Sequence, residues 1–236
     1  MNFSCESLSR FRLNLYQKHI KSRSAATLNL LDANCSMGKW SNSVVELSRS
    51  KFFERNYCSI HRSISEGAAS IKWKNVLSEV PVDNEASFPF SRFVLDATPV
   101  ARSCSSTLQD CSIVYSPNQA PGNKPIALGH QYSVVVELPG SFGKERKHWV
   151  LPRSCERISS NENGSKKGMK QIQEVIQSSN QKQQRYLTIG DSSYGSKSCL
   201  SETKSSHQLH LFRIKNNRVL FEIKQDSEEP SCSRAA

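Results

Sequence analysis

The sequence predicts an α/β protein of the α+β type, in which a small helical segment precedes a mixed β-sheet with flanking helices. Apolar residues recur at helical spacing through residues 5–66. Beyond residue 90, short runs rich in β-branched and aromatic residues alternate with helical stripes. Prolines and acidic residues in residues 77–90 separate the two patterns and predict a linker between two domains.

Residues 1–76 are predicted to form a basic helical segment that binds DNA. Residues 1–65 contain ten Lys or Arg against four Asp or Glu, and the whole chain has a formal net charge of +11. Such an excess favours a polyanionic partner, with nucleic acid the first candidate, and solubility alone is the alternative. Ser24, and either Ser41 or Ser43, are candidate N-caps. The candidate DNA contacts here are Arg10, Arg12, Lys18, Lys21 and Arg23.

Residues 91–224 are predicted to form the sheet domain, and residues 225–236 a disordered tail. The expected strands are residues 93–96, 126–138, 148–151, 186–189, 208–214 and 218–223, and the expected helices are residues 166–178 and about 194–203. Residues 99–125, rich in Ser, Cys, Pro, Asn and Gly, are expected to be irregular. Two hairpins followed by a βαβ crossover imply a mixed sheet with helices on its faces.

The cysteines favour a reducing environment. Eight of them are scattered through the chain without a CxxC pair, so no zinc-site spacing and no small disulfide framework is indicated. Free thiols in a reducing cytosol are expected, and hence a cytoplasmic location. The chain has no secretory apolar region and no apolar run of about 18 residues, so no membrane partner is expected.

The stretch YLTIGDSSYGSKS, residues 186–198, has the pattern of a strand that ends in a functional loop. A serine nucleophile would need G-x-S-x-G, and Tyr194 occupies the last glycine position. A phosphate-binding P-loop would need a lysine directly after its second glycine, and Ser196 separates Gly195 from Lys197. The third interpretation is a metal-binding carboxylate at Asp191.

A metal site at Asp191 requires a second carboxylate at a comparable strand end, and Asp96 follows the apolar run of residues 93–95. Two aspartates at the ends of neighbouring strands can share a cation although they are 95 residues apart in sequence. Carboxylate oxygens suit Mg²⁺, and a pair of such ions supports in-line displacement at phosphorus. The alternative, which spacing leaves open, is that both aspartates only cap local turns.

The segment from FVLDATPVARSC at residue 93 to SVVVELPG at residue 140 resembles the first catalytic block of bacterial insertion-sequence transposases with a ribonuclease-H-like DDE core. YLTIGDSSYGS (186–196) is similar to their second-aspartate block. SVVELSRSKFFERNYCSIHRSI (43–64) is similar to the helical region ahead of the core, and LHLFRIKNNRVLFEI (209–223) to the strand pair after the second aspartate. The resemblance covers roughly residues 8–223.

The resemblance implies a ribonuclease-H-like mixed sheet with Asp96 on the first strand and Asp191 at the end of the fourth, both catalytic and both metal ligands. It implies Mg²⁺ or Mn²⁺, two ions in a complete site, for nicking of transposon-end DNA by water and strand transfer by a 3′-hydroxyl. Lys124 and His130 fall in matched positions and are further candidate DNA contacts.

The chain departs from the family pattern at the third carboxylate, a glutamate on a helix beyond the last strands. After Phe221 the only glutamates are Glu222, Glu228 and Glu229, in a strand end and the expected tail. We therefore expect a C-terminally truncated DNA transposase that is inactive alone. The alternatives are a non-catalytic fragment that binds DNA or dimerises, including with intact transposase, and a decayed gene product that folds poorly.

Overall fold

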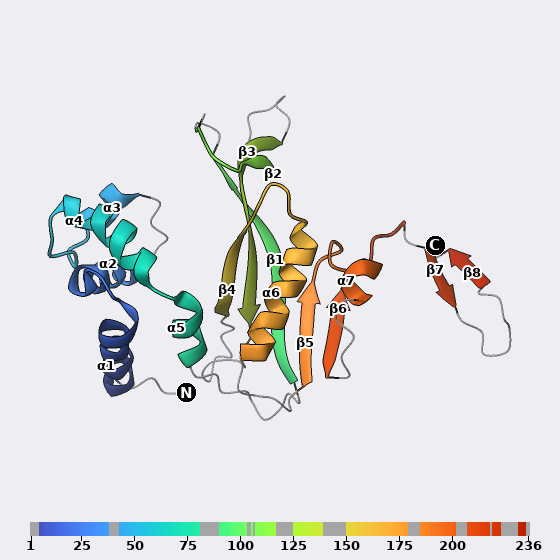
Figure 1. The fold of residues 1–236 in the computed structure, drawn as a ribbon, viewed down its shortest axis with the longest axis horizontal. Coiled ribbons are helices and arrows are strands. Elements are labelled where there is room, and N and C mark those ends of the chain that lie inside the picture. The colour runs from blue at the N-terminus through green and yellow to red at the C-terminus, as the bar shows by residue number, and fades with distance from the viewer. Residues whose placement is uncertain are drawn as a thin grey trace. The chain divides into compact units, whose positions relative to one another are not determined.

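The chain forms two compact units, Met1–Pro81 and Val82–Ala236. The first is helical and the second contains the sheet (Figure 1). The computed structural model describes residues 5–37, 43–80, 90–102, 105, 107–116, 125–138, 150–178, 185–201, 207–217, 219–222 and 231–234. Residues 81–89 of the expected linker lie outside this set.

The first unit consists of short helices around two small apolar clusters. Its elements are α1 (Cys5–Asn14), the π-helical turn η1 (Leu15–His19), α2 (Ser24–Ser36), α3 (Val44–Ser48), α4 (Tyr57–Arg62), the π-helical turn η2 (Ser63–Gly67), the 3₁₀ turn η3 (Ala68–Ser70) and α5 (Trp73–Glu79). One cluster joins Leu15, Ile20, Ile71 and Val76, and the other joins Leu30, Ala33, Phe53 and Ile60. Leu15, Phe53 and Ile60 of the apolar stripes in residues 5–66 are thus core residues, whereas Leu8, Tyr16, Val45, Phe52, Tyr57 and Ile64 are exposed.

Local sequence explains how these helices begin and meet. A Cβ atom at Gly67 would lie 1.9 Å from Thr27 Oγ1, so a residue with a side chain would push η2 away from α2. Ser43 caps α3, because its Oγ accepts a hydrogen bond from the Val45 backbone N–H at 3.1 Å, as predicted. The other predicted cap is wrong: Ser24 is already inside α2, and its hydroxyl donates to a backbone carbonyl at 2.9 Å.

The second unit is a six-stranded mixed sheet. Its elements are β1 (Phe90–Ala101), β2 (Ser112–Tyr115), β3 (Ile126–Glu137), β4 (Leu151–Ile158), α6 (Gly164–Ser178), β5 (Arg185–Gly190), α7 (Lys197–Ser201) and β6 (Gln208–Phe212). The strand order is β2-β3-β1-β5-β6, with β4 paired to β3. β1, β2 and β4 each pair antiparallel with β3, whereas β5 is parallel to both β1 and β6. The predicted fold class is therefore confirmed.

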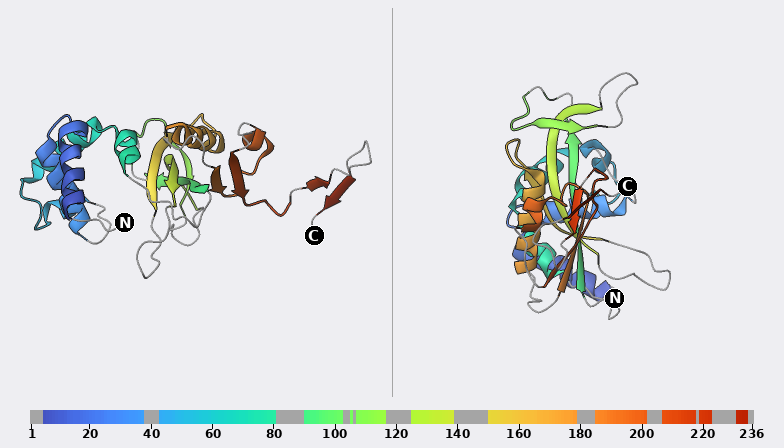
Figure 2. Two further views of the ribbon diagram at one scale, coloured as in Figure 1. Left: turned by 90° about the horizontal axis from the view of Figure 1, so that it is seen from below. Right: turned by 90° about the vertical axis from the view of Figure 1, so that its right-hand side faces the viewer.

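Both helices of this unit pack on one face of the sheet. Their shared apolar cluster contains Phe93, Leu95, Val135, Met169, Ile172, Tyr186, Tyr194 and Cys199. Met169 and Ile172 of α6 are fully buried in it, and Figure 2 shows α6 and α7 on the same side of the strands. Because side chains alternate along a strand, Val94 and Asp96 of β1 and Val134 of β3 lie on the opposite face.

Several predictions about this unit differ from the structure. Asp96 was expected at the end of a strand over residues 93–96, but it lies within β1, which continues to Ala101. Residues 99–125 are not irregular throughout, since β1 continues to Ala101 and β2 pairs with the start of β3. β4 begins at Leu151, where the predicted strand ends. Its buried positions do not alternate regularly, because the register against β3 shifts between Val135 and Val136. The expected tail contains β8 (Ser231–Arg234), paired with β7 (Val219–Glu222).

None of the described helices is long and apolar enough to cross a membrane.

Candidate functional site

Asp96 and Asp191 occupy corresponding positions on two adjacent parallel strands. The register of β1 and β5 runs from Phe90 beside Arg185 to Val94 beside Ile189. Continued by two residues, it places Asp96 beside Asp191, which directly follows the last residue of β5. Neighbouring strands are about 4.8 Å apart, and residues paired in this way share a face of the sheet. Extended in this way, the register would bring the two aspartates together.

Short hydrogen-bonded turns hold each of these carboxylates. Asp191 Oδ1 accepts from the Ser193 backbone N–H at 2.9 Å and from the Ser193 hydroxyl at 2.5 Å. Asp96 Oδ2 accepts from the Thr98 hydroxyl at 3.3 Å. The other oxygen of each carboxylate has no hydrogen-bond partner among the residues that the structure describes. Each aspartate thus has one oxygen that is oriented and one that is available to a ligand.

The negative charges of both carboxylates act on the side chain of Tyr194. It is buried against α6, where a Cβ atom at Gly168 would lie 2.8 Å from Tyr194 Cε1. Burial, followed by the negative charges of Asp191 and Asp96, raises the pKa of Tyr194 to about 12. The two acids and the tyrosine therefore belong to one electrostatic environment, and Tyr194 stays neutral at physiological pH.

The donor set suits a hard divalent cation. Two adjacent carboxylates offer oxygen ligands and leave coordination positions for water and phosphate oxygens, which is the arrangement that Mg²⁺ prefers. Mn²⁺ accepts the same ligands. No cluster of three or more His, Cys, Asp or Glu side chains is present among the described residues. The described site is thus a two-carboxylate site.

Neighbours of the pair include residues that sequence reasoning missed. Ser193 could have been found from the Asp-x-Ser pattern, in which a side-chain oxygen bonds the backbone two residues on. Arg213 follows Phe212, which pairs with Gly190, and its backbone N–H donates to the Gly190 carbonyl at 3.3 Å. An exposed arginine is therefore placed beside Asp191, where its positive charge can meet a phosphate. Nothing local in the sequence signals this position.

Three of the five basic residues expected to contact DNA form ion pairs within the first unit. These are Arg10 with Glu6 at 3.1 Å, Arg23 with Glu66 at 2.5 Å, and Arg12 with both oxygens of Asp32, the longer contact being 2.8 Å. Lys18 and Lys21 are exposed and have no ion-pair partner among the described residues. The two lysines are therefore the better placed of the five for phosphate contact.

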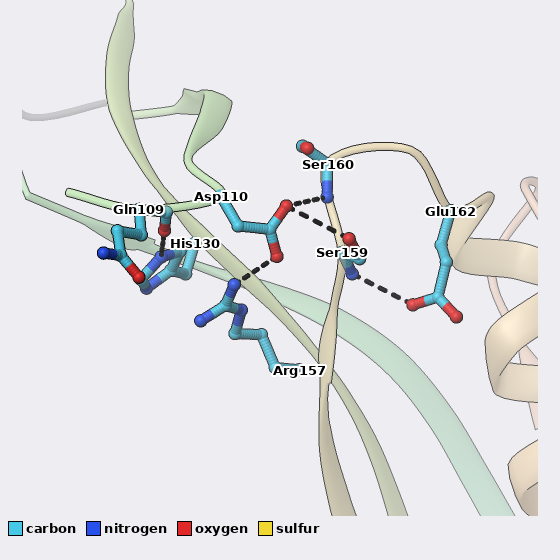
Figure 3. Close-up of polar contacts among 7 residues, drawn as sticks. All are labelled: Gln109, Asp110, His130, Arg157, Ser159, Ser160 and Glu162. Carbon is cyan, nitrogen blue, oxygen red and sulfur yellow. Dashed lines mark hydrogen bonds and ion pairs between the residues drawn. The ribbon is translucent and has the colours of Figure 1, made fainter.

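The other two predicted DNA contacts are not brought to the carboxylate pair. Lys124 lies outside the described residues. His130 pairs with Val100 on β1, whereas Asp96 pairs with Val134. The four-residue offset along β3 corresponds to about 13 Å. The His130 ring nitrogen Nε2 instead lies 3.0 Å from the Gln109 carbonyl oxygen (Figure 3), a contact that secures the loop before β2.

Asp110, next to Gln109, ties that loop to the end of β4 (Figure 3). Its carboxylate accepts from the guanidinium of Arg157, from the Ser159 hydroxyl at 3.0 Å and from the Ser160 backbone N–H at 2.8 Å. These donors, first of all Ser160, hold the pKa of Asp110 well below its usual range. Asp110 also has a left-handed backbone, with φ of 51°, which aspartate and asparagine tolerate better than most residues. These hydrogen bonds thus hold the loop before β2 against the end of β4.

We expect Asp110→Asn to destabilise the protein at pH 7 and to have less effect in acid. Asparagine keeps the backbone conformation but removes the charge. Because the folded pKa is lowered, the stabilising contribution is present above the unfolded pKa of about 4 and is lost as pH falls through the folded value. Urea midpoints at pH 7 and about pH 2 measure this; equal differences from the wild type at both pH values would contradict it.

Comparison with known proteins identifies no family for this chain. No protein-family model matches the chain, and no curated protein matches it.

Proposed function

We propose that this chain carries the nuclease core of a DDE-type DNA transposase, joined to a basic helical DNA-binding segment. The observation that supports this most is the register of β1 and β5, which ends with Val94 beside Ile189 and, if continued by two residues, would set Asp96 beside Asp191. β1, β3 and β4 are antiparallel and are followed by a parallel crossover through α6 to β5, which is the arrangement that such a core requires; the short β2 is an additional antiparallel strand.

In this proposal Asp96 and Asp191 hold one or two Mg²⁺ or Mn²⁺ ions. Bound there, the metal would activate an attacking hydroxyl and stabilise the leaving oxygen of a DNA phosphodiester. Ser193 and Thr98 orient the carboxylates. Arg213 beside Asp191 supplies positive charge for a phosphate. Because no third carboxylate joins this pair among the described residues, nicking by this chain alone is expected to be slow at most, in line with the inactivity expected from the sequence.

In this proposal the basic helical unit binds DNA first. The chain has a formal net charge of +11, and Lys18 and Lys21 are exposed without ion-pair partners in the described part of the unit. Contacts of this kind bind phosphate independently of sequence and weaken with salt. The proposal includes a cytoplasmic location, because the six cysteines whose side chains the structure describes are free and free thiols persist in reducing compartments.

The test is conversion of supercoiled plasmid to the nicked form with Mg²⁺ or Mn²⁺. The wild type is expected to nick only with metal, and Asp96→Asn is expected to lose this activity. Glu54→Gln, which removes an exposed carboxylate in the helical unit, is the control and is expected to nick like the wild type. Nicking that survives Asp96→Asn would overturn the assignment of the site.

A second function, a non-catalytic DNA-binding or dimerising fragment, is favoured by the presence of only two carboxylates in the described site. It predicts salt-sensitive DNA binding without cleavage in any metal. Fluorescence anisotropy with duplex DNA over a salt series, on the preparation used for nicking, separates the two functions. Binding that weakens with salt, together with an intact plasmid, would favour the second.

A further inference from the structure

The loop between β5 and α7, residues 191–196, carries Asp191 on an exposed side and has one buried anchor. Tyr194 is the only buried residue of this loop, with 1% of its surface exposed. Asp191 and Ser193 are exposed. A fully buried side chain touches many neighbours, whereas an exposed one touches few. The loop therefore depends on Tyr194 for most of its contact with the core of the sheet unit.

Tyr194 closes the turn that begins at Asp191. The Tyr194 backbone N–H donates to the Asp191 carbonyl oxygen at 3.3 Å, so these residues are the first and last of a four-residue turn. Within the turn, the Ser193 backbone N–H donates to Asp191 Oδ1 at 2.9 Å. Because hydrogen bonds join both the carbonyl and the carboxylate of Asp191 to the end of the turn, a displacement of Tyr194 would move the carboxylate.

Two glycines flank the Tyr194 ring at opposite edges. A Cβ atom at Gly168 of α6 would lie 2.8 Å from Cε1, and a Cβ atom at Gly190 of β5 would lie 3.0 Å from Cδ2. Real Cβ atoms rarely come this close to another atom, so the lack of a side chain at both positions makes room for the ring. Phe212 of β6 packs beside it, with ring centroids 6.2 Å apart. The ring is thus confined by α6, β5 and β6.

The aromatic ring, rather than the hydroxyl group, makes these contacts. The Tyr194 hydroxyl lies near Ser133 of β3, but it forms no well-aligned hydrogen bond with any residue that the structure describes. A buried polar group without such a bond does not stabilise the fold. Phenylalanine at position 194 should therefore keep the ring in place, whereas leucine, which lacks the ring, should not.

We propose that Tyr194 is a positioning residue for Asp191: its ring, seated between Gly168 and Gly190, fixes the turn that presents the carboxylate. Groups that orient a metal ligand typically change metal affinity by about 10–100-fold. The inference rests on the proposed function for the metal, whereas the order of the turn can be measured without any metal. It also gives Gly168, on a helix that precedes the loop, an indirect part in the geometry of the site.

Amide hydrogen exchange and Mn²⁺ affinity, measured on the same variants, test this role. In Tyr194→Leu, exchange of the Ser193 backbone N–H is expected to rise roughly 10-fold or more. The dissociation constant for Mn²⁺, from electron paramagnetic resonance of the free ion, is expected to rise by about 10-fold or more. Tyr194→Phe is expected to behave like the wild type in both measurements.

Tyr186→Leu is the matched control for loss of a buried ring. Tyr186 lies in the same apolar cluster, near the start of β5 and away from the turn. Its replacement should lower the urea midpoint without changing Ser193 exchange or Mn²⁺ affinity. Equal effects of Tyr186→Leu and Tyr194→Leu on Ser193 exchange would overturn the proposal, because they would show a general loss of packing.

A double-variant cycle tests the contact with α6. Gly168→Ala is expected to raise Ser193 exchange roughly 10-fold, because the added Cβ displaces the ring, and to add little in the Tyr194→Leu background, where the ring is absent. Gly164→Ala is the matched control, because a Cβ atom there would meet only the end of one side chain, Ile158 Cδ1, at 3.3 Å. If Tyr194→Leu does not fold, Gly168→Ala provides the same test.

Circular dichroism and urea midpoints establish that each variant is folded. Unchanged Ser193 exchange in folded Tyr194→Leu would overturn the proposal, and so would a wild type in which this N–H exchanges as fast as in an unstructured peptide. A wild type that binds no Mn²⁺ would instead overturn the proposed function. In that case Ser193 exchange still decides whether Tyr194 fixes the turn.

Discussion

Replacing Ile172 with alanine is expected to lower the free energy of unfolding of the sheet unit by about 2–5 kcal/mol. The Ile172 side chain has no exposed surface and lies in the cluster that joins α6 to β1, β3 and β5. Truncation removes several buried methylene and methyl groups and leaves a cavity beneath the helix, because Met169 and Tyr194 are themselves packed there. A loss of this size is a large fraction of the stability of a typical domain.

Urea unfolding followed by circular dichroism measures this loss. Wild type and variant must be compared at one protein concentration, since dimerisation would add to apparent stability. Ile214→Ala is the matched control, because Ile214 is 51% exposed and its truncation is expected to change stability by less than about 0.5 kcal/mol. Similar effects at the two positions would contradict the placement of the core under α6.

The second large effect is expected at the carboxylate pair. Asp191→Asn should raise the dissociation constant for Mn²⁺ on the order of 100-fold, since it removes one of two anionic ligands. The substitution keeps the size of the side chain, and its remaining oxygen can still accept from the Ser193 backbone N–H. The change should therefore appear in metal affinity with little change in the unfolding midpoint.

Ser193→Ala distinguishes orientation from ligation at the same site. The Ser193 hydroxyl donates to Asp191 Oδ1, and loss of a group that orients a metal ligand typically costs about 10–100-fold in affinity. We expect a loss smaller than that of Asp191→Asn. Electron paramagnetic resonance of free Mn²⁺ measures both, with Glu54→Gln as the unaffected control. Wild-type affinity in Asp191→Asn would show that the pair is no metal site.

The elements of the sheet unit were predictable where local pattern is strong. Residues 126–138 were expected as a strand and β3 is Ile126–Glu137; residues 166–178 were expected as a helix and α6 is Gly164–Ser178. Both follow from hydrophobic periodicity, which is a property of neighbouring residues. β2 and β4 were missed or misplaced because β2 is short, and the buried positions of β4 include Ser154 and follow a register shift.

The candidate site was only partly predictable. The sequence offered Asp96 and Asp191 as separate strand ends, and it left open whether each only caps a turn. In the structure both do accept local hydrogen bonds, from Thr98 and Ser193, and the register of β1 and β5, if continued by two residues, would also set them side by side. Tyr194 entered the sequence argument only as the residue that breaks a serine motif, yet in the structure burial and the charges of both aspartates raise its pKa.

By itself, the sequence determined the kinds and order of most elements, the basic character of the helical segment and the two candidate aspartates, although Asp96 lies within β1 rather than at a strand end. Only the tertiary structure decided which distant groups meet: Arg12 with Asp32, and Asp110 with Arg157. It also decided the register of β1 and β5, which aligns the segments that carry Asp96 and Asp191. The physical reason is that periodicity reflects contacts within a few residues, whereas register and ion pairing join residues distant in the chain.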